Sequence, residues 1–167
     1  MRLLIAVLCV LSALLCGCQG KQDLQKKTGH GEQPPAIQAD KEDTGMVGVI
    51  KRKVFDVNKS KPVGKAIDDY RYFTRREWKE TDAQNGTVYV DFVGGLDPKM
   101  IDAGLKTGGI VARSVNIKFV IKPDGTCFVG MITLYDTKTD GKSYSIPVTA
   151  VAGVMNAIYA NTELPLK

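Results

Sequence analysis

Apolar residues recur with two different periods along residues 46–167, and the period changes where one element gives way to the next. Pro62 suits the first turn of a helix, and the apolar positions after it have near i, i+3 and i+4 spacing, which predicts an amphipathic helix. Gly64 weakens that helix slightly, because glycine loses the most backbone freedom on folding. The apolar positions are Val63, Ala66, Ile67, Tyr70 and Phe73.

A second helix is predicted at the end of the chain. It begins at Pro147, with Ser145 near its cap, and runs to about Ala160 before Asn161, a tolerable C-terminal residue. Its broad apolar face consists of Val148, Val151, Val154, Met155, Ile158 and Tyr159. At the start of the domain, residues 47–55 are β-branched and basic, which predicts an edge strand whose lysines discourage pairing with another chain.

Between these segments, alternation with a period of two predicts two antiparallel hairpins. The first runs from Trp78 to Val93 and turns at Asn85-Gly86. The second joins Val111–Ile121 to Thr126–Tyr135 through Lys122-Pro123-Asp124-Gly125-Thr126, where proline presets φ and glycine supplies a positive φ. The sequence therefore predicts an α+β fold, an antiparallel meander of about four strands with an N-terminal and a C-terminal helix packed on it.

The turn of the second hairpin fixes how its strands pair. We expect a type I turn followed by a G1 bulge, which makes a three-residue loop. Three cross-strand pairs then share the core face: Ile121 with Cys127, Phe119 with Val129, and Ile117 with Met131. A two-residue loop would shift the pairing by one residue and replace this set with Val120, Phe128 and Ile132.

The second face of the sheet is also apolar in this interpretation. The residues on it are Val120, Phe128, Ile132 and Leu134. Helices on opposite faces would cover everything, whereas helices that share the core face would leave an apolar patch as the leading partner site. We favour helices on the shared core face.

Residues 94–109 form a glycine-containing connection between the hairpins. Its centre is expected to form a short helix with Asp97 as N-cap and Pro98 at the first position. Two interpretations stay open, a recognition loop for a partner and a helix tucked under the sheet. The apolar residues that such a loop would present are Met100, Ile101 and Leu105.

The first 17 residues have the order of a secretion signal, in which Arg2 precedes an almost entirely apolar run. That run, residues 3–15, is too short to span a bilayer, which needs about 20 apolar residues. Leu15-Cys16-Gly17-Cys18 resembles a bacterial lipobox, with a glycine before the expected cut. An uncleaved anchor and an ordinary secreted protein are the alternatives.

The lipoprotein resemblance implies an attachment site and a location. Cys18 would receive a diacylglyceryl group, become the mature N-terminus and be acylated on its amine, and stable anchoring needs such multiple chains. Gln19 after it implies sorting to the outer membrane, with the domain facing the periplasm. Residues 18–45, rich in polar residues, glycine and proline, are predicted to be a disordered tether, and residues 46–167 a single domain.

Cys127 is the one thiol of the predicted domain. Because the cell envelope is oxidising and no partner cysteine is at hand, we expect burial as a small hydrophobe to protect it. Redox sensing and an intermolecular disulfide stay open as alternatives.

Charge and candidate chemistry narrow the function by exclusion. Loss of Arg2 with the signal lowers the formal net charge from +5 to +4, and the basic residues between 51 and 79 either meet an anionic partner or form a solvated surface. His30, the only histidine, falls in the tether, so no Cys/His or Ser/His/Asp site is expected in the domain. Residues 136–141 resemble a calcium loop, but lysine and proline stand at ligand positions and we predict a turn. No cofactor, metal or nucleic-acid partner is expected.

Three segments carry a resemblance within the domain. Pro62-Val63-Gly64-Lys65-Ala66-Ile67, Trp78 and Asp124-Gly125 resemble the pattern of small uncharacterised bacterial envelope lipoproteins with a helix and a four-stranded antiparallel sheet. The resemblance implies the architecture and the envelope setting and supplies no catalytic residue. We expect a non-enzymatic binding or accessory module with an envelope-protein or cell-wall partner; the alternatives are a cell-wall-modifying enzyme and an inhibitor or immunity lipoprotein.

Overall fold

A meander of five antiparallel strands forms the centre of the computed structural model, which describes residues 45–166. The sheet order follows the chain order, so the predicted α+β class and meander are confirmed, with five strands where about four were expected. The predicted signal peptide and nearly all of the tether lie outside the described residues. In chain order the elements are α1 (Gly45–Arg52), α2 (Val63–Asp68), β1 (Phe73–Asp82), η1 (Gln84–Gly86), β2 (Val88–Leu96), η2 (Pro98–Met100), α3 (Ala103–Thr107), β3 (Ile110–Ile121), β4 (Cys127–Lys138), β5 (Ser143–Pro147) and α4 (Val151–Ala160).

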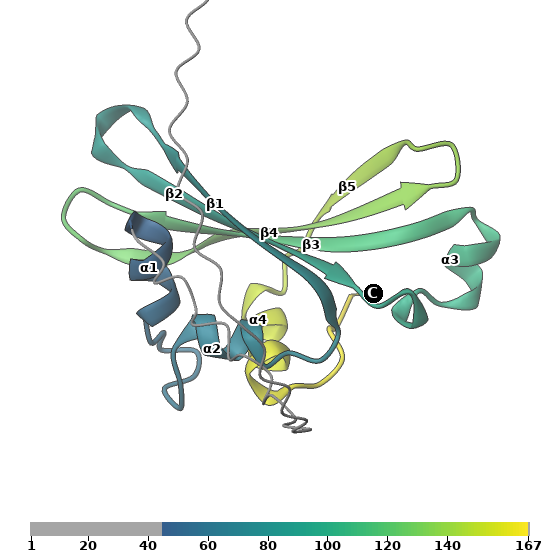
Figure 1. The fold of residues 1–167 in the computed structure, drawn as a ribbon, viewed down its shortest axis with the longest axis horizontal. Helices are drawn as coiled ribbons and strands as arrows, with labels where there is room; N and C mark the ends of the chain where they lie inside the picture. The colour runs from purple at the N-terminus through teal and green to yellow at the C-terminus, as the bar shows by residue number, and fades with distance from the viewer. Residues whose placement is uncertain (1–44, 167) are drawn as a thin grey trace, which may run out of the picture. The chain divides into compact units, whose positions relative to one another are not determined.

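Helices α1, α2 and α4 lie against the same face of the sheet (Figure 1). Their apolar side chains and those of the strands form one core. Fully buried members are Ile50, Ile67, Tyr70, Phe92, Ile117, Phe119, Ile132, Met155 and Ile158. The expectation that the two predicted helices share a face is therefore confirmed, and no described helix covers the opposite face.

A row of aromatic rings runs through this core from β1 across β2 to β3. Ring centroids lie 5.2 Å apart for Phe73 and Phe92, 4.9 Å for Phe92 and Trp78, and 5.9 Å for Trp78 and Phe119. Phe55, which follows α1, continues the row at 5.7 Å from Phe119. Such contacts contribute about 0.5–1.5 kcal/mol each beyond the area they bury, so this aromatic row ties the helical layer to three strands.

The prediction of an edge strand over residues 47–55 is wrong, because α1 occupies most of this segment. Its apolar residues also satisfy a helical period, and Ile50 is fully buried against the sheet. The basic residues fall in the last turn, where the helix dipole favours cations. At the other end, a carboxylate oxygen of Glu80 on β1 accepts a hydrogen bond from the N–H of Met46 at 2.7 Å and fixes the start of α1.

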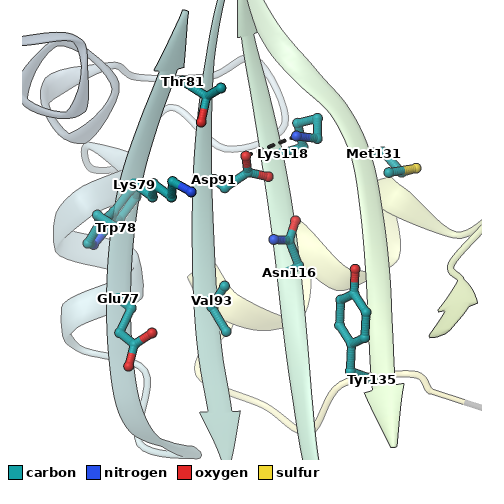
Figure 2. Close-up of a pocket in the computed structure, with 10 residues that line it drawn as sticks. All are labelled: Glu77, Trp78, Lys79, Thr81, Asp91, Val93, Asn116, Lys118, Met131 and Tyr135. Carbon is teal, nitrogen blue, oxygen red and sulfur yellow. Dashed lines mark hydrogen bonds and ion pairs between the residues drawn. The ribbon is translucent and has the colours of Figure 1, made fainter. Parts of the chain in front are cut away.

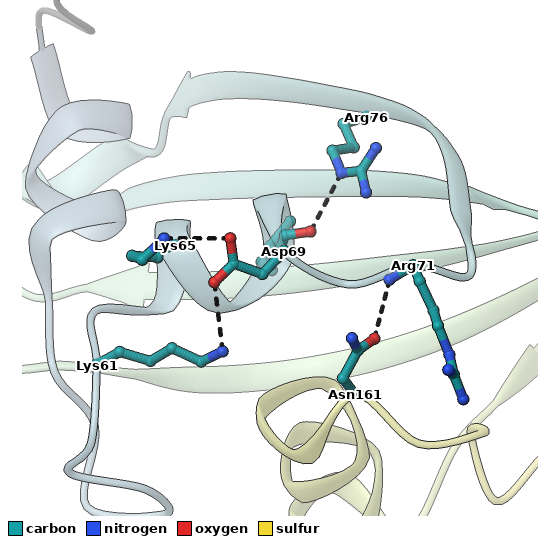
Figure 3. A network of polar contacts seen from close by, with 7 residues as sticks. Lys61, Lys65, Asp69, Arg71, Arg76 and Asn161 are labelled. Carbon is teal, nitrogen blue, oxygen red and sulfur yellow. Dashed lines mark hydrogen bonds and ion pairs between the residues drawn. The ribbon is translucent and has the colours of Figure 1, made fainter.

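The first predicted helix is present as α2 but is shorter than its apolar pattern. Polar contacts hold the chain where α2 ends (Figure 3). Arg76 of β1 donates to the carbonyl oxygens of Ile67 at 3.1 Å and Tyr70 at 2.7 Å, and such contacts satisfy carbonyls that a helix end leaves free. The amide oxygen of Asn161 accepts from the N–H of Arg71 at 3.0 Å. The end of α2 is therefore fastened both to β1 and to the residue that follows α4.

Two hairpin turns share one chemistry. In the turn from Lys122 to Thr126, Gly125 has a positive φ of 80° and the carboxylate of Asp124 accepts from the N–H of Thr126 at 2.8 Å. That hydrogen bond holds the pKa of Asp124 below its usual value. The turn from Lys138 to Lys142 repeats the arrangement, with Asp140 as the acceptor. The turn predicted over residues 136–141 is present only from residue 139 on, because residues 136–138 belong to β4, and it leads into β5, a strand that was not predicted.

The register of the β3–β4 hairpin follows the prediction near the turn and changes at Gly130. Gly130 is an extra residue in β4, a β-bulge, so Ile117 pairs with Ile132 and not with Met131. Residues beyond the bulge therefore exchange faces. Ile132 and Leu134, expected on the outer face, are buried in the core, and Met131, expected in the core, is exposed.

The closing helix begins later than predicted. Ser145 and Pro147 belong to β5, and α4 starts at Val151. Proline suits the outer side of an edge strand because it cannot donate to a ladder. Asn161 ends the helix in the left-handed conformation with φ 55°, as its C-terminal role requires. The buried residues of α4 include four of the predicted face, namely Val154, Met155, Ile158 and Tyr159.

Gly64 marks a close approach of α1 and α2 rather than a weakness. A Cβ at this position would lie 2.7 Å from the Cβ and 2.8 Å from the carbonyl oxygen of Lys51. We predict that Gly64→Ala destabilises the fold by about 1–3 kcal/mol through overpacking. Gly153→Ala is the matched control in α4, where the new Cβ has only ordinary contacts and helix propensity gives a gain of up to about 1 kcal/mol. Urea unfolding measures both, and equal effects of the two changes would contradict the close approach.

Candidate binding face of the sheet

The face of the sheet that points away from the helices forms a shallow hollow of about 650 Å³. Side chains from four neighbouring strands line it, because alternate residues of each strand point to this side (Figure 2). We call this surface the open face. The lining residues that point to this side are Glu77, Lys79, Thr81, Asp91, Val93, Asn116, Lys118, Met131 and Tyr135. Trp78 also borders the hollow, but its ring packs on the core side of the sheet.

An ion pair crosses the middle of the open face. The ammonium group of Lys118 lies 2.9 Å from a carboxylate oxygen of Asp91 on the neighbouring strand (Figure 2). The same ammonium lies 5.0 Å from the ring centroid of Tyr89, a cation–π contact. At the rim, Glu77 pairs with Arg75 at 3.3 Å. These carboxylates are balanced by cations, so the hollow combines hydrogen-bonding groups with apolar surface and little net charge.

The apolar part of the open face comes mainly from β4. Tyr135 is 38% exposed, Met131 is 45% exposed, and Phe128 lies half-exposed nearer the turn. The bulge at Gly130 turns Met131 and Tyr135 to this side. The sequence interpretation missed both residues, although a glycine inside a strand pattern is the signal that marks a bulge.

The apolar patch expected on the second face is therefore only partly present. Of its four predicted members, Val120 and Phe128 lie on the strands' outer side, while Ile132 and Leu134 are in the core. Met131 and Tyr135 take their places, and the neighbouring strands add the polar groups of Asp91, Asn116 and Lys118, so the open face is mixed rather than apolar.

The connection at residues 94–109 has the predicted cap but differs elsewhere, because residues 94–96 belong to β2 and the single expected helix is divided into η2 and α3. Asp97 accepts from the N–H of Lys99 at 2.9 Å with Pro98 at the first position of η2, and Asp102 caps α3 in the same way. Its three candidate contact residues differ in exposure. Ile101 is only 2% exposed, whereas Met100 and Leu105 are half-buried, and none of the three lines the open face.

Several of the basic residues between 51 and 79 contact groups of the domain itself, and the three that line one hollow, Lys51, Arg52 and Lys65, share it with Asp68 and Asp69. Lys61 and Lys65 both contact the carboxylate of Asp69, at 3.5 and 3.2 Å (Figure 3). The hydrogen bond from Lys65, together with the charges of both lysines, lowers the pKa of Asp69. Arg76, which is half-buried, donates to backbone carbonyls, and Arg71 lies over the ring of Tyr72. This distribution favours the solvated-surface interpretation over a single anion-binding face.

A buried ion pair lies at the far end of β3 and β4. The guanidinium of Arg113 makes two hydrogen bonds to the carboxylate of Asp136, at 2.6 and 2.8 Å, and the side chains are 9% and 7% exposed. The hydrogen bonds raise the pKa of Arg113. Both residues sit between strands under the C-terminal segment, so we assign this pair a structural role.

Cys127 is half-buried at the start of β4 and packs against the core. Burial raises the pKa of its thiol, which lowers the fraction of reactive thiolate. Its environment therefore fits a packing role better than a nucleophilic one. Cys18, the predicted lipid-attachment residue, lies outside the described residues.

Comparison with protein-family models, curated proteins and solved structures finds no match to this chain. Within residues 45–166, no helix is both long and apolar enough to cross a membrane. The same part of the chain contains no group of three or more histidine, cysteine, aspartate or glutamate side chains arranged to hold a metal ion.

We predict that Arg113→Met and Asp136→Leu each destabilise the domain by about 3 kcal/mol, because each leaves one buried charge without its partner. The double variant should cost clearly less than the sum of the two, since it leaves no unpaired charge. Guanidinium unfolding of the three variants completes the cycle. Additive losses would show that the two side chains contribute separately.

Proposed function

We propose that this protein is a lipid-anchored bacterial envelope protein whose domain is a non-catalytic binding module, with the open face as its binding surface. The anchor rests on the lipobox pattern Leu15-Cys16-Gly17-Cys18. Its Gln19 favours the outer membrane, with the domain facing the periplasm. If the predicted tether behaves as a random coil, its roughly 27 residues would hold the domain at a root-mean-square distance of roughly 30 Å from the bilayer.

One observation carries the choice of surface: the helices that cover the sheet lie on one side of it. Antiparallel sheets can leave one face in water, and that face is then usually polar. Here it also exposes Met131, Tyr135 and Phe128, beside the ion pair of Lys118 and Asp91. Exposed aromatic and methionine side chains among polar groups are typical of interaction surfaces.

The composition of the open face supports binding rather than catalysis. The domain sequence contains no histidine, and its one cysteine is half-buried with a raised thiol pKa. The lining groups can instead donate and accept hydrogen bonds around an apolar contact, as a protein or cell-wall ligand requires. The proposed partner is therefore an envelope protein or the cell wall itself.

The anchor is tested by comparing two cysteines of the signal. We predict that Cys18→Ser abolishes incorporation of labelled palmitate and releases the chain from the membrane fraction, because the acylated sulfur is lost. Cys16→Ser is the matched control and should leave both properties unchanged. Labelling that persists in Cys18→Ser and disappears in Cys16→Ser would contradict the proposed attachment site.

The surface is tested by photo-crosslinking in intact cells. A benzophenone amino acid at Met131 or Tyr135 should give discrete crosslinked products, whereas the same group at Val49, equally exposed on α1, should not. Each of the variants Met131→Ser and Tyr135→Ser should lower the yield of a crosslinked product, or the affinity for isolated peptidoglycan, at least about tenfold. Hot-spot contacts contribute about 2 kcal/mol or more to binding.

Val49→Ser is the control for loss of exposed apolar surface and should leave binding unchanged. Circular dichroism checks that each variant is folded. Crosslinks confined to Val49, or binding unaffected by the β4 variants, would contradict the assignment of the open face.

A further inference from the structure

The two edge strands of the sheet differ in how well they are protected against pairing. The edge strand β1 carries a run of charged residues and a bulge between Phe73 and Arg75, both of which discourage pairing with another strand. The opposite edge, β5, has the sequence Ser-Tyr-Ser-Ile-Pro, with no charged residue and no bulge. All of its residues are exposed, and within residues 45–166 it pairs with β4 alone.

Backbone hydrogen bonds show which groups of β5 point outward. The N–H of Val148 donates to the carbonyl of Ile132, and the carbonyl of Lys142 accepts from Lys138, so even-numbered residues here face β4. Because these directions alternate along a strand, Ser143 and Ser145 present their N–H and C=O groups at the free edge. Pro147 presents its carbonyl there and has no N–H to present.

The side chains of β5 that face the helical layer are also uncovered. The β4–β5 hairpin extends beyond α4 (Figure 1), and Tyr144 and Ile146 are each 47% exposed. When two antiparallel strands pair, an aromatic residue on one strand and a β-branched residue opposite it on the other form a favourable cross-strand pair.

We propose that β5 pairs antiparallel with β5 of a second copy of this chain, about a two-fold axis at Ser145. This register pairs the outward backbone groups of β5 with one another and brings its exposed side chains together. The two Ser145 residues exchange N–H and C=O groups, and each Ser143 N–H meets the carbonyl of Pro147 on the other copy. Each Tyr144 then lies beside Ile146 of the other copy. The missing proline N–H costs one bond per copy, and four remain.

A pairing of five residues per strand is small beside the 1,200–2,000 Å² or so that stable interfaces bury, so the dimer is weak in dilute solution. The two-fold axis is perpendicular to the sheet, so both helical layers lie on one side and both open faces on the other. If the proposed lipid anchor holds, two chains on one bilayer would have a raised effective concentration. The pairing itself does not depend on the anchor.

Disulfide trapping tests the register in the full chain purified in mild detergent, with Cys127→Ala as the parent. Ser145→Cys should give a covalent dimer well above the parent's background, because facing residues of such a pair have Cα atoms about 5.5 Å apart, within disulfide reach. Ser143→Cys is the matched control on the same strand. Its two copies would lie about 13 Å apart along the strands and should not crosslink.

A second measurement uses the chain with Cys127 intact and places a charged side chain on β5. Ser145→Lys places two like charges across the axis, and sedimentation equilibrium should show at least a tenfold weaker association than that of the unsubstituted chain. Three results would each overturn the proposal: equal crosslinking of Ser143→Cys and Ser145→Cys, an unsubstituted chain that is monomeric at all concentrations, and a dimer insensitive to Ser145→Lys. A strand from a different protein at this edge would appear as a crosslink of another size in cells while the purified chain stays monomeric, which also overturns it.

Discussion

One-sided burial is the constraint on which the rest of this structure depends. The aromatic row from Phe73 through Phe92 and Trp78 to Phe119 packs three strands and the helical layer into a single core. Within residues 45–166 the helices cover one sheet face only, since α3 lies at the end of the sheet and α1, α2 and α4 share the core side. The strands must therefore tolerate water on the other face, and their alternate positions carry polar and charged residues for that reason.

Much of this arrangement could be predicted from local pattern. The helical spacing after Pro62, the Asp124-Gly125 turn and the cap at Asp97 each depend on residues close in sequence, and each is present. The choice between helix and strand for residues 47–55 could not be made in this way. A short run of β-branched residues fits both periods, and the contact of Ile50 with the core, together with the Glu80 carboxylate at the start of α1, decides it through distant residues.

The fifth strand is a different case, because the sequence contains the turn that precedes it. Aspartate and glycine predict the hairpin turn Lys122–Thr126, and Lys138–Lys142 has the same two residues at the same spacing. Pro147 suits the first turn of a helix, so the sequence pattern predicts a helix start at a residue that the structure places in β5. The residues of the candidate site were harder to predict from sequence, because which side chains reach the open face depends on strand register. Of the two interpretations of residues 94–109, burial of Ile101 fits a segment packed against the fold.

The bulge at Gly130 determines both which residues of β4 lie in the core and which lie on the open face. Before it, odd-numbered residues of β4 face the core, and after it even-numbered residues do, so one extra residue places Ile132, Leu134 and Asp136 inside. The same residue sends Met131 and Tyr135 outward. A β4 without the bulge would bury Tyr135 and expose the carboxylate that Arg113 needs. A Cβ at Gly130 would lie 2.6 Å from a methyl carbon of Val120, so glycine is the residue that permits both the packing and the face. The composition of the open face is therefore set by the stability of the core, and the two cannot vary independently.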